Sequence, residues 1–453
     1  MSYRCSNCGY FTPRWLGKCP QCGEWNSFLL TSREESKKKE ESSYSPPLSL
    51  SEIREKKLQL GNRFSTGSGE VDRVLGGGVV EGSLVLLSGD PGIGKSTLLL
   101  KIAESIAREG KKVLYASSEE SLYQVYLRVE RLGLDCNPPL FLLSTNSFEE
   151  VREGISSLRP QVVIVDSIQN LGRENLEFLP GSIATLRDLS SRFMEIAKKE
   201  NVALFLVGHV TKEGAIAGPK VLEHLVDVVL YLEGDANHPL RLLRSMKNRF
   251  GSTQEVGILE MQEKGLIEVR DPSHYFMEDS RLTSIGTART VWAEGKRAMV
   301  LEIQSLVHPS YFDFPRRVSL GMDLNRLHLL LAVIEKNTRL RFSRHDVYLS
   351  MVGGIKTSET ALDLPVCFSL VSSRLNREIN KETVYLGEVG LSGEIRPIPL
   401  LEQRVNESAR MGIKRVVISS YYPSSSLPES QEEIMVVGYS TIREALEKEG
   451  LLS

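Results

Sequence analysis

The chain has 453 residues, which is too long for one hydrophobic core, so we expect two sizeable domains and a smaller unit. Its hydrophobic fraction of 41% and charged fraction of 25% exclude wholesale disorder and a fibrous class, and its apolar runs are too short to span a membrane. The net charge of −2 gives no attraction of the whole molecule to nucleic acid, so any such contact must use a local basic surface.

Residues 1–30 are predicted to form a small zinc module. Two Cys-x-x-Cys pairs occur there with no secretory signal before them, so we expect a cytoplasmic protein whose cysteines bind metal and do not form disulfides. Four thiolates complete the tetrahedral shell of Zn²⁺, which makes the site structural and not catalytic. The predicted ligands are Cys5, Cys8, Cys19 and Cys22. Nearby Arg4, Arg14, Trp15 and Lys18 either touch nucleic acid or a partner, or are only solvated.

Residues 31–60 are polar and charged and cannot bury enough apolar area to fold, so we expect a flexible linker. From 61 to 270, short apolar runs alternate with helical patterns, which predicts an α/β domain with a parallel sheet. The predicted strands are 84–88, 113–116, 140–143, 162–165, 202–207 and 228–232. Closely spaced strands at 240–246, 255–260 and 266–269 indicate hairpins that close the domain.

The segment after the first of these strands matches the P-loop pattern G-x4-G-K-[ST] and is followed by a helical pattern. Its glycines allow main-chain N–H groups to converge on phosphate oxygens, and the helix N-terminus adds its positive dipole end. We expect Lys95 to bind the β- and γ-phosphates of ATP and Ser96 to ligate Mg²⁺. The predicted nucleotide-binding residues are Gly89, Asp90, Pro91, Gly92, Ile93, Gly94, Lys95, Ser96, Thr97 and Asp166.

Acidic residues end two further predicted strands. Asp166 follows the buried run 162–165, where a carboxylate beside a P-loop can hold the Mg²⁺ shell, as a Walker B aspartate does. Glu119 and Glu120 follow the strand 113–116, where one carboxylate can face the γ-phosphate and activate water, and Glu119 is our choice. The alternative is that both glutamates only occupy the first turn of the next helix, where acids are favoured.

Four features occur together in this chain: the four-cysteine module, the P-loop GDPGIGKST, the segment Val-Gly-His209-Val-Thr-Lys212, and the pentapeptide Lys-Asn-Arg-Phe-Gly at 247–251. In this combination the chain resembles the bacterial RadA (Sms) family of recombination and repair proteins. The resemblance covers nearly the whole chain. It implies a RecA-like core in which Glu119 activates water and His209 senses the γ-phosphate. Without the resemblance, His209 is an ordinary histidine at a strand end.

The resemblance also implies catalytic groups supplied between subunits. Lys247 and Arg249 are similar to a basic pair that RecA relatives place on the γ-phosphate of a neighbour, where it stabilises charge that develops in phosphoryl transfer. The alternative is a solvated basic strand. Residues 212–220 follow the sensor strand, where RecA-like motors carry a DNA-contacting loop, so Lys212 and Lys220 are predicted DNA contacts, with Arg173 as a weaker one.

Residues 271–453 contain a second α/β pattern, with a strand near 299–306, helices near 324–336 and 361–375, and a last strand at 415–418. The segments 353–363 and 387–404 resemble the Lon protease domain. The stretch that carries the catalytic serine in that family reads Glu359-Thr360-Ala361-Leu362 here, and Glu402 and Arg404 flank the place of the lysine. Neither a carboxylate nor a guanidinium can replace a lysine that must accept a proton, so we expect no peptidase activity. Its basic residues could bind duplex DNA: Arg316, Arg317, Arg339, Arg341, Arg344 and Lys356.

Taken together, the resemblance implies a DNA-dependent ATPase that uses ATP, Mg²⁺ and Zn²⁺ and acts in homologous recombination and DNA repair. It implies a homo-oligomeric ring, a hexamer, that encloses single-stranded DNA and drives branch migration of recombination intermediates in helicase fashion, with a RecA-type recombinase as partner. Two other functions stay open, an ATP-dependent protease and an ATP-switched loader or scaffold that binds DNA but moves nothing.

Overall fold

The computed structural model describes residues 2–5, 11–12, 14–31, 49, 51–52, 63–172, 180–209, 222–234, 238–277, 285–311, 314–422 and 434–452. The chain divides into two compact units, Met1–Gly61 and Asn62–Ser453. Most of the linker predicted at 31–60 lies outside the described residues. Within the described ranges, no helix combines the length and the apolar character needed to cross a bilayer.

The first unit contains a small antiparallel sheet of order β2-β1-β3, with β1 at Ser2–Cys5, β2 at Phe11–Thr12 and β3 at Phe28–Thr31. A tight turn between β2 and β3 carries Cys19 and Cys22. It closes where the N–H of Gly23 donates to the carbonyl of Cys19 at 2.9 Å, and the φ of +74° at Gly23 favours glycine there.

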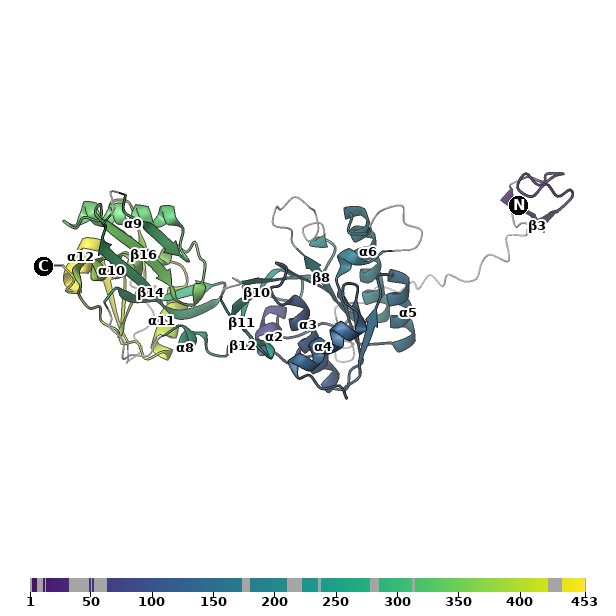
Figure 1. Cartoon of the computed structure of the whole chain (residues 1–453), viewed down its shortest axis with the longest axis horizontal. Helices are drawn as coiled ribbons and strands as arrows, with labels where there is room; N and C mark the ends of the chain where they lie inside the picture. Colours follow the sequence, from purple (N-terminus) through teal and green to yellow (C-terminus); the bar gives the residue numbers. More distant parts are fainter. Residues whose placement is uncertain are drawn as a thin grey trace. The chain divides into compact units, whose positions relative to one another are not determined.

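The second unit begins with a nine-stranded sheet of order β12-β11-β10-β9-β4-β8-β7-β5-β6 (Figure 1). Its parallel strands are β4 (Leu84–Gly89), β5 (Val113–Ser117), β6 (Leu140–Ser144), β7 (Val162–Asp166), β8 (Ala203–His209) and β9 (Val228–Gly234). The antiparallel strands are β10 (Leu240–Asn248), β11 (Val256–Gln262) and β12 (Gly265–Glu268). The strands predicted in this region are confirmed, with small shifts at their ends.

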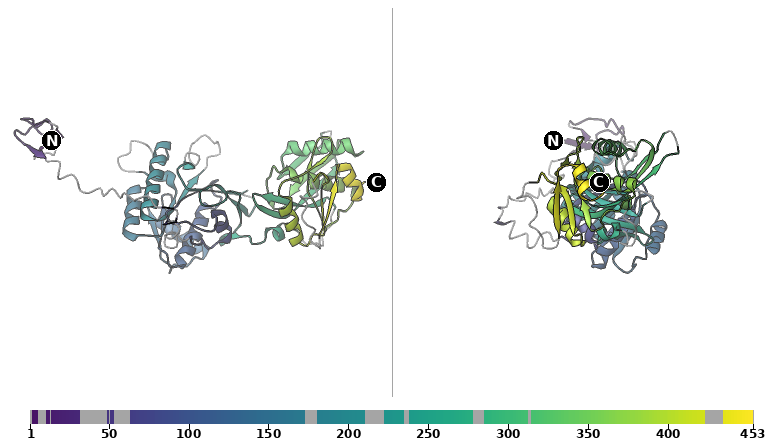
Figure 2. Two further views of the ribbon diagram at one scale, coloured as in Figure 1. Left: turned by 180° about the vertical axis from the view of Figure 1, so that it is seen from behind. Right: turned by 90° about the vertical axis from the view of Figure 1, so that its left-hand side faces the viewer.

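Helices cover both faces of this sheet, as Figure 2 shows from behind. Helices α2 (Gly69–Leu75), α3 (Lys95–Arg108) and α4 (Leu122–Leu132) share one core, and α5 (Phe148–Leu158) and α6 (Ile183–Glu200) share the other. Neighbouring strand residues point to opposite faces, so Val85 and Leu87 join the first core while Leu84 and Leu86 join the second. Burial on both faces explains why these strands are continuous apolar runs in the sequence.

The short helix α8 (Pro272–Phe276), capped by the side chain of Asp271, leads into a seven-stranded sheet of order β15-β16-β14-β13-β17-β20-β21. These strands are β13 (Thr287–Glu294), β14 (Arg297–Pro309), β15 (Arg317–Leu320), β16 (His345–Met351), β17 (Thr383–Tyr385), β20 (Arg415–Ser419) and β21 (Met435–Tyr439). One prediction is wrong, because the strand at 415–418 is not the last. β21 pairs with it in parallel as an edge strand, and its half-exposed residues give only a weak pattern.

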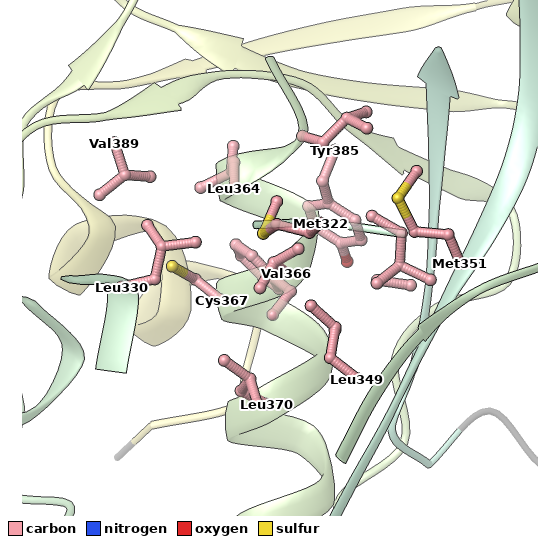
Figure 3. Packing of buried hydrophobic residues seen from close by; sticks show 14 of the residues in the cluster. Met322, Leu330, Leu349, Met351, Leu364, Val366, Cys367, Leu370, Tyr385 and Val389 are labelled. Carbon is pink, nitrogen blue, oxygen red and sulfur yellow. The ribbon is translucent and has the colours of Figure 1, made fainter. Parts of the chain in front are cut away.

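Helices α9 (Leu324–Asn337), α10 (Asp363–Leu375) and α12 (Ile442–Lys448) cover one face of this second sheet, and α11 (Leu401–Arg410) covers the other. Figure 3 shows Cys367 and Leu370 of α10 among Leu330 of α9, Leu349 of β16 and Tyr385 of β17. The helix predicted at 361–375 is confirmed in its main part, since a short 3-10 turn at Thr360–Leu362 precedes α10. A small hairpin, β18 (Glu388–Val389) with β19 (Ile395–Arg396), completes this part.

Candidate functional site

The P-loop joins β4 to α3, and its shape depends on three glycines with positive φ. These are Gly89 (+151°), Gly92 (+76°) and Gly94 (+115°). A Cβ atom at Gly89 would lie 2.3 Å from the carbonyl oxygen of Leu232, whereas one at Gly92 would meet nothing within 4 Å. The loop is therefore closed against the sheet at its first glycine and open at Gly92, as a cradle for phosphates requires.

The other P-loop residues predicted from the sequence occupy the same turn. Asp90, Pro91 and Ile93 form its body, and Ser96 and Thr97 lie in the first turn of α3. The Lys95 amine donates to the carbonyl oxygens of Gly89 at 2.8 Å and Asp90 at 2.9 Å, so the loop itself positions the lysine side chain.

Lys95 is only 4% exposed. Burial lowers the pKa of Lys95, and the nearby carboxylates of Asp166, Glu119 and Asp90 oppose that shift. The three carboxylates thus surround the lysine that would bind the phosphates.

The strand order explains why these residues meet. β4, β8, β7 and β5 are neighbours and parallel, so their carboxyl ends lie at one edge of the sheet. Gly89 pairs with His209 across β4 and β8, and Ser117 pairs with Asp166 across β5 and β7. The P-loop, His209, Asp166 and Glu119 therefore converge, although each comes from a different strand.

Asp166 ends β7 and is 6% exposed. The Tyr115 hydroxyl donates to its Oδ2 atom at 2.6 Å, and its Oδ1 atom is buried with no hydrogen-bond partner among the described residues. Burial and the charge of Asp166 raise the pKa of Tyr115 well above its usual value, so the hydroxyl stays a donor. Sequence reasoning missed Tyr115, because an aromatic residue in a buried strand looks like ordinary core.

Glu119 and Glu120 differ in what they contact. The Ser167 hydroxyl donates to Glu119 Oε1 at 2.6 Å, and His209 Nε2 lies 3.0 Å from the same oxygen. Glu120 instead forms an ion pair with Arg128. Both glutamates precede Ser121, which caps α4, so neither lies within the helix. Glu119 is the glutamate that faces the P-loop lysine.

The basic pair lies at the opposite end of the sheet from the P-loop. Lys247 pairs with Val229 on β9, whereas Gly89 pairs with Leu232, three residues further along that strand. This offset corresponds to roughly 10 Å at the rise per residue of a strand. The Lys247 amine points still further away, donating to the carbonyl oxygens of Glu223 and Val226 at 2.8 Å each.

Arg249 is anchored at the same end, 3.2 Å from the buried carboxylate of Asp227, which also binds Lys198 at 3.1 Å. Neither basic side chain of the pair is directed at the P-loop of its own chain. The predicted DNA contacts Lys212, Lys220 and Arg173 lie outside the described residues.

The sulfur atoms of Cys5, Cys19 and Cys22 lie within 4.8 Å of one another, and those of Cys5 and Cys22 are 3.7 Å apart. Tetrahedral Zn–S bonds of about 2.3 Å would separate two sulfurs by about 3.8 Å, so these thiols fit a zinc ion. Cys5 and Cys19 are each 1% exposed, as expected for a structural site. Cys8, the fourth predicted ligand, lies outside the described residues.

In residues 271–453, which we call the third domain, the positions that correspond to the serine and lysine of the Lon protease have other partners. Arg404 is fully buried on α11 and forms an ion pair with Glu359, while its Nη1 and Nε atoms donate to the carbonyl oxygens of Val291 and Pro399, respectively. The Thr360 hydroxyl donates to Glu388 at 2.8 Å. Glu402 is exposed.

Comparison with known proteins finds matches in three parts of the chain. Three family models match: the rubredoxin metal binding domain at residues 3–29, an AAA domain at 51–215, and the subunit ChlI of Mg-chelatase at 330–421. Two solved structures match 46% of the chain. They are the RadB recombinase, 27% identical with a TM-score of 0.36, and the KaiC-like protein PH0186 from Pyrococcus horikoshii OT3, 20% identical with a TM-score of 0.39; each is covered to 99%.

The fold and the site define a RecA-like P-loop ATPase that carries a zinc ribbon and a Lon-like C-terminal domain. Curated relatives match over almost the whole length. DNA repair protein RadA of Bacillus subtilis is 44% identical over 448 residues, and that of Halalkalibacterium halodurans is 43% identical over 453 residues; each alignment covers 98% of this chain and 97% of the relative. DNA repair protein RadA of Listeria monocytogenes is 43% identical over 448 residues, with the same coverage. The chain belongs to the RadA family.

Proposed function

We propose that this protein is a DNA-dependent ATPase of homologous recombination and DNA repair that works as a homo-oligomeric ring, a hexamer, on single-stranded DNA. It drives branch migration of recombination intermediates beside a RecA-type recombinase. The observation that carries the proposal is the split of the catalytic groups, because the P-loop with Glu119 and the basic pair with Arg249 occupy opposite ends of one sheet. The RadA relatives, named as DNA repair proteins, support the role in repair.

The residues present fit a magnesium ion with bound ATP. The Ser96 hydroxyl at the start of α3 and the unpartnered Oδ1 of Asp166 are the oxygens that would hold it, the latter through water. When bound, Mg²⁺ neutralises charge on the β- and γ-phosphates. The chain's own part is to cradle the phosphates with main-chain N–H groups and to bind the β- and γ-phosphates with the Lys95 amine.

Glu119 is the group that orients and deprotonates the attacking water. With Oε1 held by Ser167 and His209, its other oxygen can accept a hydrogen bond from water. His209 ends β8, directly before the predicted DNA-contacting loop. A histidine in this place can respond to the γ-phosphate on one side and to DNA on the other, which would couple the two ligands.

Lys247 and Arg249 complete the nucleotide site of the next copy, where a cation stabilises charge developing on the transferred phosphoryl group. Lys212, Lys220 and Arg173 bind DNA phosphates. The third domain contributes DNA binding or ring contacts without peptidase activity, since Thr360 has a carboxylate beside it and Arg404 is committed to Glu359.

Mixing two inactive variants tests the composite site. Lys95→Ala removes the P-loop lysine and Arg249→Ala removes the trans cation, so each variant alone should lose turnover. In randomly mixed rings, about a quarter of the interfaces would pair an intact P-loop with an intact cation, so activity should return to about a quarter of the wild-type level. Arg270→Ala, which removes an exposed arginine paired with Glu268, is the matched control and should be fully active.

If native mass spectrometry shows that mixed rings form and ATP turnover still stays at zero, Arg249 acts within its own chain or not at all. Two further assays separate the other functions. Degradation of unfolded protein in the presence of ATP would identify a protease. Strand displacement that proceeds equally with a non-hydrolysable ATP analogue would identify a loader or scaffold.

A further inference from the structure

A hydroxyl group lies against the Walker B carboxylate from the neighbouring strand. β5 and β7 pair with Tyr115 opposite Ile164 and Ser117 opposite Asp166. Residues two apart on a strand share a face, so Tyr115 lies on the face where Ser117 meets Asp166. That face also carries α3, the helix that follows the P-loop. The phenol ring is therefore core, but its hydroxyl ends at the nucleotide site.

The contact fixes one oxygen of the carboxylate and leaves the other for a ligand. Tyr115 Oη donates to Asp166 Oδ2 at 2.6 Å, with Tyr115 only 1% exposed and Asp166 6% exposed. Asp166 Oδ1 is equally inaccessible to bulk solvent and has no hydrogen-bond partner in the described part of the chain. Turning the carboxylate would break the one hydrogen bond it has, and a buried charge without partners is costly. Asp166 is thus held in a single orientation.

We propose that Tyr115 is a positioning residue of the nucleotide site, whose hydroxyl holds Asp166 so that Oδ1 faces the hydrated Mg²⁺ of bound Mg·ATP. Tyr115 touches neither the nucleotide nor the metal. It acts as do the outer partners of metal-ligating carboxylates, which set the direction of the ligand and are felt in metal affinity. The proposal rests on the proposed function in one respect, the role of Asp166 at the metal.

Tyr115→Phe isolates the hydroxyl, because the ring and its core contacts remain. We expect the Mg²⁺ concentration for half-maximal ATP hydrolysis to rise about tenfold, the lower end of the effect of losing an outer partner. A second readout does not depend on turnover: Mn²⁺ binding to the complex with a non-hydrolysable ATP analogue, followed by electron paramagnetic resonance, should weaken by the same factor. Binding of a fluorescent ATP analogue without metal should stay unchanged.

Tyr385→Phe is the matched control. Tyr385 is also 1% exposed, but it lies in the third domain, where its ring stacks on Phe368. Its variant therefore loses a buried hydroxyl that is not part of the nucleotide site. It should leave the Mg²⁺ and Mn²⁺ dependence unchanged. Thermal unfolding of both variants measures how much each hydroxyl contributes to the stability of the protein, separately from any effect on metal binding.

Unchanged metal affinity in Tyr115→Phe, or an equal change in Tyr385→Phe, would overturn the inference. Asp166→Asn separates this outcome from failure of the proposed function. If Asp166→Asn loses metal-dependent turnover while Tyr115→Phe binds metal normally, only the role of Tyr115 is wrong. If Asp166→Asn hydrolyses ATP with wild-type metal dependence, the assignment of Asp166 itself is wrong.

Discussion

His209 Nε2 and Glu119 Oε1 lie 3.0 Å apart, although β7 lies between β8, which ends at His209, and β5, which Glu119 follows. The Ser167 hydroxyl, directly after β7, bridges that gap and donates to the same carboxylate oxygen at 2.6 Å. Glu119 is therefore held from two neighbouring strands at once. A carboxylate fixed in this way loses little freedom when it orients a water molecule.

Glu119→Gln should lower ATP turnover by about 100-fold or more, because the amide keeps the shape but cannot accept a proton. Affinity for a fluorescent ATP analogue should change little. Glu120→Gln is the matched control, since the adjacent glutamate pairs with Arg128, and it should retain most of the activity. Steady-state hydrolysis and equilibrium binding measure both effects, and equal losses in the two variants would contradict the assignment.

Replacing Cys19 and Cys22 with Ser should release one zinc ion per chain and unfold the first unit, since such a small segment depends on its metal. The nucleotide site should survive, because the P-loop belongs to the other compact unit. Cys136→Ser removes an exposed free cysteine and should keep the zinc. Elemental analysis together with nucleotide binding tests this prediction; unchanged zinc in the Cys19/Cys22 variant would reject the site.

DNA affinity should fall steeply with salt despite the net charge of −2, because the lysines that displace counterions set the slope. Removing Lys212 and Lys220 should reduce the slope of log affinity against log salt by about 1 to 2 and uncouple hydrolysis from DNA. Lys264→Ala with Lys296→Ala removes two exposed lysines elsewhere and serves as control. If the variant without Lys212 and Lys220 keeps full stimulation of ATP hydrolysis by DNA, these lysines are not the contact, and the basic residues of the third domain become the candidate DNA-binding surface.

Arg404→Met should destabilise the protein by about 3 kcal/mol, the lower end of the range for a broken buried ion pair, because it leaves the half-buried Glu359 carboxylate without its cation. Combining it with Glu359→Gln should recover much of the loss, since the uncompensated charge disappears. Urea unfolding followed by circular dichroism gives the three free energies. A small effect of Arg404→Met alone would show that the ion pair between Arg404 and Glu359 contributes little to stability.

The hydrogen bonds from Arg410 lower the pKa of Asp271 to about 2, below the value of about 3.9 expected in the unfolded chain. The interaction therefore adds stability above pH 4 and loses it as the pH falls towards 2. Asp271→Asn should lower the urea midpoint at pH 7, by a small amount because the pair is partly exposed to solvent. The difference from wild type should shrink on acidification; a difference independent of pH would contradict the linkage.

The sequence predicted the elements that follow local patterns. It indicates the P-loop, Asp166 at the end of its strand, Glu119 shortly after its strand, and most strands of both sheets, because motif spacing and apolar runs depend on the local sequence. The partners of these residues were not predicted. Three such contacts join residues between 21 and 51 positions apart: Tyr115 with Asp166, Ser167 with Glu119, and Lys247 with the carbonyl of Val226. These pairings depend on the order of the strands in the sheet. The edge strand β21 was missed because half-exposed residues show little periodicity.

The arrangement of the P-loop and Arg249 at opposite ends of the nine-stranded sheet limits how many complete nucleotide sites an assembly can have. In the proposed assembly, where Arg249 completes the nucleotide site of the next copy, the P-loop at one end of this sheet and Arg249 at the other require copies to associate head to tail. An open array leaves its first P-loop without a cation and its last cation without a P-loop, whereas a closed one leaves none. The rate of ATP hydrolysis per chain should therefore increase with the number of copies and reach its maximum only when the ring closes. The specific activity of a preparation would then fall as the fraction of open assemblies rises.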